Sequence, residues 1–136
     1  MAFKRNFATW TGLAAAAGLL MLAPASPARA DAAQQVATAA QHAGYAAQSK
    51  DLKTVKSHLH HTVNCLVGPK ARGFDSKELN PCKDQGNGAI PDTTDPAKKK
   101  GLQAALSKAR AGLRAKDLAA AQKDAADAEA ALKKGM

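Results

Sequence analysis

Alanine and aliphatic residues recur at helical spacing through most of this chain, and this pattern restricts the fold more than any other feature. In residues 31–67 and 95–134, small or aliphatic residues return every three or four positions, which is the period of one face of an α-helix. Only 4% of all residues are aromatic, so the helices must approach closely around a thin core. The sequence therefore predicts an all-α fold, most simply a four-helix bundle.

A short polar turn divides each of these stretches into a helical hairpin. Ser49-Lys50-Asp51 lies between the first two stripes and supplies capping residues, and a second turn falls near Ala115-Lys116-Asp117. Asp95-Pro96, a capping residue followed by a first-turn proline, marks the start of the second hairpin. The expected core stripes are Val36, Ala39, Ala40, Ala43, Ala46 and Ala47; Leu52, Val55, Leu59, Val63 and Leu66; Leu102, Leu106, Ala109 and Leu113; and Leu118, Ala121, Ala125, Ala128 and Leu132.

Residues 1–30 have the form of a secretory signal peptide. Lys4 and Arg5 precede an apolar run that is too short to span a membrane, and Ala28-Arg29-Ala30 gives a small-residue cleavage site. Cleavage would leave 106 of the 136 residues as a single helical domain, 31–136. We therefore expect a periplasmic protein.

The charge pattern argues against nucleic-acid binding. Without the three basic residues of the signal peptide, 17 basic residues remain against 11 acidic ones, a net charge of +6. The charges occur in short groups such as Lys98-Lys99-Lys100, with no aromatic residues among them to stack on bases. This pattern is typical of solvated helix faces, with weak contact to an anionic membrane surface as the alternative.

A connection of 27 residues, 68–94, joins the two hairpins and is much longer than a usual link between helices. Its apolar residues Phe74, Leu79 and Ile90 indicate that it packs against the helices. Cys82 lies within it, and Cys65 lies near the end of the second predicted helix. Because two cysteines in an exported protein usually pair, we expect a Cys65–Cys82 disulfide that ties the loop to this helix.

The four histidines occupy two neighbouring predicted helices. Three lie in HLHH, residues 58–61, and the fourth is His42. On a helical wheel His58 and His61 share one flank, whereas His60 lies about 160° from His58. With the hairpin turn centred on Lys50, antiparallel pairing places His42 level with His58 and on the same side. The sequence therefore predicts that His42, His58 and His61 converge.

Three converging imidazoles favour a divalent transition metal. Copper, zinc and nickel accept nitrogen ligands of this kind, and His60 is a candidate fourth ligand. The competing interpretation is that these are ordinary half-exposed helix residues. The sequence contains no C-x-x-C-H haem motif, no C-x-x-C motif and no glycine-rich phosphate loop, and no nucleophile with its base can be assembled, so we do not expect an enzyme.

Alanine-rich helical hairpins with histidines on QHAG and HLHH resemble the small metal-binding proteins of the bacterial periplasm. The resemblance covers most of residues 31–136 in architecture and is specific at the four histidines. It implies a non-catalytic protein that sequesters or carries a divalent metal. The loop NCLVGPKARGFDSKELNPC and the small number of histidines depart from that family, which favours one metal site over several.

Two other functions stay open at this stage. The chain could be a non-catalytic envelope interaction or stress module, whose disulfide-pinned loop contacts another envelope protein through residues 86–91. Non-covalent haem binding is the third alternative, although the mature chain has few aromatic residues and only Met136 as a methionine. The sequence does not distinguish a monomer from a homodimer.

Overall fold

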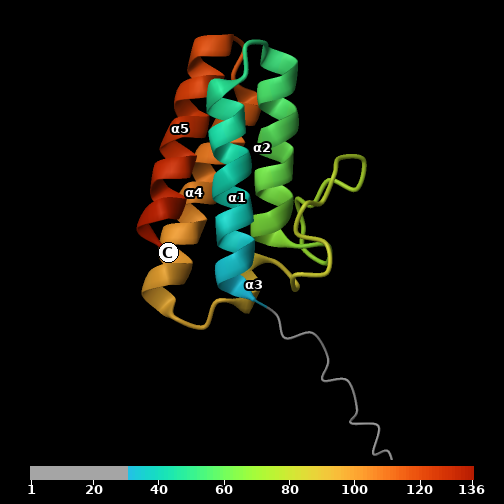
Figure 1. Cartoon of the computed structure of the whole chain (residues 1–136), viewed down its shortest axis with the longest axis vertical. Helices are drawn as coiled ribbons and strands as arrows, with labels where there is room; N and C mark the ends of the chain where they lie inside the picture. The colour runs from blue at the N-terminus through green and yellow to red at the C-terminus, as the bar shows by residue number, and fades with distance from the viewer. Residues whose placement is uncertain (1–30) are drawn as a thin grey trace, which may run out of the picture.

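The computed structural model describes residues 31–136, in which helices are joined by turns and by one long loop (Figure 1). The helices are α1 (Ala32–Gln48), α2 (Leu52–Val67), α3 (Ala89–Asp92), α4 (Pro96–Arg114) and α5 (Leu118–Lys134). No strand occurs among the described residues. The predicted all-α class is confirmed. The predicted signal peptide, residues 1–30, lies outside the described residues.

An aspartate begins each of the four long helices. The carboxylates of Asp31, Asp51, Asp95 and Asp117 accept hydrogen bonds from backbone N–H groups of the first turn. These groups have no carbonyl partner within the helix, so the aspartates satisfy donors that would otherwise be unpaired. Pro96 follows Asp95 in the first turn, where its missing N–H removes no helical bond.

The four long helices lie side by side, and both hairpin turns are at the same end of the molecule (Figure 1). Helix α1 packs against α2 and α5, and α4 packs against α5 and α2. At the turns, Gln122 Nε2 donates to the carbonyl oxygen of Ser49 at 2.8 Å, which joins α5 to the α1–α2 turn. This arrangement is compatible with a helical bundle. None of the described helices has both the length and the apolar character needed to cross a membrane.

The core is thin and consists largely of alanine. Most residues of the predicted stripes are buried, while Ala47, Leu52, Leu106, Leu113 and Leu118 pack only partly against the core. Gly112 shows how closely the helices approach. A Cβ atom there would lie 2.6 Å from Leu59 Cδ1 on α2 and 3.3 Å from the carbonyl oxygen of Ala121 on α5.

The connection between α2 and α4 packs against the ends of α1 and α2, and it contains the short helix α3, which the sequence analysis did not predict. Gly68, at φ +76°, meets this segment so tightly that a Cβ atom would lie 1.6 Å from the carbonyl oxygen of Asn87. The buried side chain of Gln35 on α1 accepts from Gly88 N and donates to the carboxylate of Asp92. These contacts hold α3 in place.

The predicted disulfide between Cys65 and Cys82 is confirmed, with an S–S distance of 2.00 Å and both residues buried. The disulfide is consistent with an oxidising compartment. The neighbouring Asn64 is fully buried and also binds the loop. Its Nδ2 donates to the carbonyl oxygens of Asp75 and Leu79, and its Oδ1 accepts from Asp75 N. Residues 75–79 are therefore fixed against α2 by three hydrogen bonds.

Candidate metal centre

His42 of α1 meets His58 and His61 of α2 on one flank of the first hairpin. One ring nitrogen from each residue lies within 4.8 Å of the other two, and all three residues are half-buried. The Nδ1 atoms of His42 and His58 are 3.3 Å apart. The structure thus brings together the three histidines that the helical wheel and the hairpin register placed on one side.

Small residues and one threonine explain why the imidazoles meet. Ala39 and Ala43 are fully buried on α1, so α2 can approach closely on that face. Thr62 Oγ1 lies 3.3 Å from the carbonyl oxygen of Ala39 and 3.0 Å from that of His58, and it can donate to either. This hydroxyl links the two helices next to the cluster and fixes their register.

The separation of His42 and His58 suits two ligands of one metal ion. Tetrahedral coordination with metal–nitrogen bonds of about 2.0–2.1 Å places ligand nitrogens about 3.3–3.4 Å apart, and the observed Nδ1···Nδ1 distance is 3.3 Å. The same distance accommodates an N–H···N hydrogen bond between two neutral imidazoles. The metal-free pair can therefore hold its geometry without an ion.

The surroundings of the cluster favour uncharged imidazoles. Burial, followed by repulsion from His61 and His58, lowers the pKa of His42 to about 4. Burial also lowers the pKa of His61, His58 adds to the effect, and Glu78 partly opposes it. A histidine must be neutral to donate its lone pair to a metal, so His42 and His61 are in the ligand-competent state at neutral pH.

The two ring nitrogens of His61 have different surroundings. Its Nδ1 is buried and has no hydrogen-bond partner within the described part of the chain. Its other nitrogen, Nε2, lies 3.6 Å from Glu78 Oε2. A buried polar atom without a partner costs about 1–3 kcal/mol. Coordination of a cation by Nδ1 would remove this penalty.

His60 lies apart from the cluster. Its Nδ1 is 3.4 Å from Asp75 Oδ2 in the loop, and it does not belong to the group of nitrogens that could share an ion. The structure therefore does not bring the candidate fourth ligand to the other three histidines. Cys65 offers no thiolate, because it is bonded to Cys82.

Two residues beside the cluster were missed by the sequence analysis. The ring of Tyr45 lies 5.7 Å from that of His42 and 5.5 Å from that of His58, and Gln41 Nε2 donates to its hydroxyl. Its position three residues after His42 could have indicated this contact. Glu78 had no comparable signal, because it lies in a loop.

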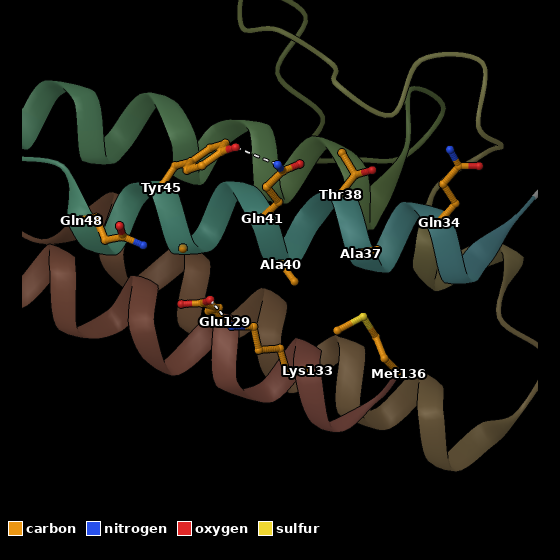
Figure 2. Close-up of a pocket in the computed structure, with 11 residues that line it drawn as sticks. Gln34, Ala37, Thr38, Ala40, Gln41, Tyr45, Gln48, Glu129, Lys133 and Met136 are labelled. Carbon is orange, nitrogen blue, oxygen red and sulfur yellow. Dashed lines mark hydrogen bonds and ion pairs between the residues drawn. The ribbon is translucent and has the colours of Figure 1, made fainter.

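A separate groove runs between α1 and α5 (Figure 2). Gln41 and Tyr45 lie along its α1 side, and Glu129 and Lys133 form an ion pair on its α5 side. None of the histidines lines this groove. The charged pair of the groove is already satisfied within α5, whereas the histidine cluster has a buried nitrogen without a partner in the described chain, so the cluster is the better candidate site.

Comparisons with protein-family models, with curated proteins and with solved structures found no match for this chain. The resemblance to small periplasmic metal-binding proteins accordingly rests on the sequence features quoted above. What distinguishes the candidate site is its own chemistry: three close imidazoles, lowered pKa values at His42 and His61, and a buried nitrogen without a partner.

Proposed function

We propose that this protein is a non-catalytic metal-binding protein of the periplasm, which sequesters or carries one divalent transition metal through His42, His58 and His61. One observation carries the proposal. Three imidazole nitrogens gather within 4.8 Å of one another while the buried Nδ1 of His61 has no partner in the described chain. In this proposal the fold is a four-helix bundle of two hairpins, and the first hairpin provides the site.

The ligand type narrows the choice of metal. With both cysteines in the disulfide, the site offers imidazole nitrogen and no thiolate. Such a site suits copper(II), nickel(II) and zinc(II), and the general order of affinities for divalent metals places copper(II) first. Three protein ligands also leave a coordination position for water or for a ligand of another molecule. An open position of this kind suits a carrier that releases its metal.

Calorimetric titration of the single-histidine variants tests this proposal. We expect saturable binding of one Cu²⁺, Ni²⁺ or Zn²⁺ ion per chain, with copper the tightest. His42→Ala, His58→Ala and His61→Ala should each weaken binding at least about 100-fold, because each removes one of only three ligands.

His60→Ala is the matched control, because it removes an imidazole from the same helix that does not reach the cluster. It should change the affinity less than about threefold. Equal losses in all four variants would indicate loose attraction to any histidine. The absence of saturable binding in the parent protein would exclude the metal site.

The loop offers one observation in favour of an interaction module. Leu79 is a large apolar side chain that is 62% exposed, although the loop around it is anchored to α2. The stretch 86–91 fits this role less well, because Gly88 and Ala89 are buried against the helix ends. If the protein binds no metal, docking through Leu79 becomes the better account.

A further inference from the structure

Two acidic residues of the loop lie beside two adjacent histidines of α2. Glu78 Oε2 is 3.6 Å from His61 Nε2, and Asp75 Oδ2 is 3.4 Å from His60 Nδ1. The two carboxylates are equally exposed, at 34% each, but only His61 belongs to the cluster. The loop therefore places one carboxylate against a candidate ligand and another against a residue outside the site.

The position of Glu78 is fixed from two directions. The three hydrogen bonds of the buried Asn64 hold residues 75–79, and therefore the backbone of Glu78, against α2. Ser57, one helical turn before His61, has its hydroxyl 3.3 Å from Glu78 Oε2 and can donate to it. The carboxylate is thus held near the outer nitrogen of His61.

Glu78 is not itself placed to be a ligand. It does not belong to the group of donor atoms that lie within 4.8 Å of one another. Its contact is with Nε2 of His61, and the orphaned nitrogen of the same ring is Nδ1. The two nitrogens of His61 therefore have different environments.

We propose that Glu78 is a positioning residue of the metal site, which keeps the proton of neutral His61 on Nε2 and so leaves the lone pair of Nδ1 free for the metal. This inference rests on the proposed function. Histidine ligands commonly donate their other N–H to a carboxylate, which fixes the tautomer and the ring orientation. A negative charge favours an N–H over a lone pair facing it even at 3.6 Å, a separation longer than that of a hydrogen bond.

The inference gives the long loop a role in metal binding. Asn64 and Cys65, three and four residues after His61, are the points at which α2 holds the loop. The loop then places the carboxylate of Glu78 beside His61. The ligand and the group that orients it are therefore built from one helix and the loop that follows it.

Long-range ¹H–¹⁵N NMR on the metal-free protein with its disulfide formed tests the tautomer directly. At about pH 7.5, above the ordinary histidine range, neutral His61 should carry its proton on Nε2. In Glu78→Ala this preference should be lost, whereas in Asp75→Ala it should persist. A proton on Nδ1 in the parent protein, or an unchanged tautomer in Glu78→Ala, would overturn the inference.

Zinc titration of the same variants tests the consequence for the metal. Glu78→Ala should bind Zn²⁺ about 10–100-fold more weakly, the usual effect of removing a carboxylate that orients a histidine ligand. Asp75→Ala should stay within about threefold of the parent. Equal losses in both variants would assign the effect to the loop as a whole and overturn the role of Glu78. If the parent protein binds no Zn²⁺, the proposed function fails, while the NMR result still decides the tautomer.

Discussion

His60 and His61 are neighbours in sequence but have different surroundings. Consecutive residues of an α-helix point about 100° apart, so His61 faces His42 on α1 while His60 faces Asp75 in the loop. The side chain of His61 is 12% exposed and contains a buried unpaired nitrogen, whereas His60 is 33% exposed and meets Asp75. The rotation of one helix position thus separates a candidate ligand from a surface residue.

The lowered pKa of His42 predicts how the stability of the metal-free protein depends on pH. The pKa of His42 is about 4 in the folded protein, against an ordinary value of 6.5 that applies when the chain unfolds. Between these values the unfolded state binds more protons, so the free energy of unfolding should decrease as the pH falls from about 6.5 towards 4. The groups facing His42 are His58, His61 and Tyr45, and repulsion from His61 and His58 adds to the effect of burial on its pKa.

Urea unfolding at several pH values between about 4.5 and 7 measures this dependence. His42→Gln should flatten the slope, whereas His60→Gln, which alters a histidine outside the cluster, should not. The capping carboxylate of Asp51 has a lowered pKa because it accepts hydrogen bonds from Thr54, so it titrates below this window. A slope that is the same in the parent and in His42→Gln would contradict the prediction.

The histidine cluster could be predicted from sequence because it depends only on regular helix geometry. Helical periodicity and the position of the turn at Lys50 place His42 opposite His58. Glu78 could not be predicted in this way. Its position follows from the path of the loop, which is set by the hydrogen bonds of Asn64 and by the disulfide, and neither produces a periodic pattern.

At the scale of elements, the starts of the helices were the most predictable feature. Each of the four long helices begins directly after an aspartate whose side chain caps it, and its stripe of small residues follows. Helix α3 was missed because four residues are too few to show a helical period and because Pro91 lies within them. Its place depends on distant contacts with Gln35 and Gly68.

Helix α4 contains two glycines whose replacement should have opposite effects. Gly112 lies in the closest part of the interface, where an added Cβ atom would meet the buried Leu59 at 2.6 Å. Gly112→Ala should therefore lower the free energy of unfolding by about 1–3 kcal/mol through overpacking. Gly101 has no atom within 4 Å of an added Cβ. Gly101→Ala should raise stability by about 0.5–1 kcal/mol, because alanine loses less backbone entropy in a helix.

Denaturant unfolding of these two variants provides a paired measurement of helix packing. Both changes add one methyl group to the same helix, so their difference isolates the effect of the interface. A stabilised Gly112→Ala variant would show that α2, α4 and α5 are less closely packed than described.

At the scale of the whole molecule, the two hairpins have different tasks. The first hairpin and its following loop contain all of the candidate ligands and Glu78, while α4 and α5 contain no histidine and bury the apolar faces of α1 and α2. The disulfide joins α2 to the loop close to the site. Cys65 follows His61 by one helical turn, and Cys82 follows Glu78 by four residues. Redox state, loop position and metal affinity should therefore be linked.

Replacing Cys65 and Cys82 by serine tests this link. The disulfide joins residues 17 positions apart, and the chain-entropy estimate for such a loop is about 3 kcal/mol of stability. The variant should unfold at a lower urea concentration, and its Zn²⁺ affinity should fall, because a loosened loop no longer keeps Glu78 beside His61. If the disulfide affects the metal only through Glu78, this loss should not exceed the loss in Glu78→Ala.

A double-mutant cycle separates this mechanism from a general loss of structure. If the disulfide acts through Glu78, adding Glu78→Ala to the serine variant should cause little further loss of Zn²⁺ affinity, since the carboxylate has already left its place. Fully additive losses would mean that the disulfide supports the site by another route, for example by fixing the last turn of α2. Unchanged affinity in the serine variant would mean that Asn64, with its three hydrogen bonds to residues 75–79, holds the loop without help from the disulfide.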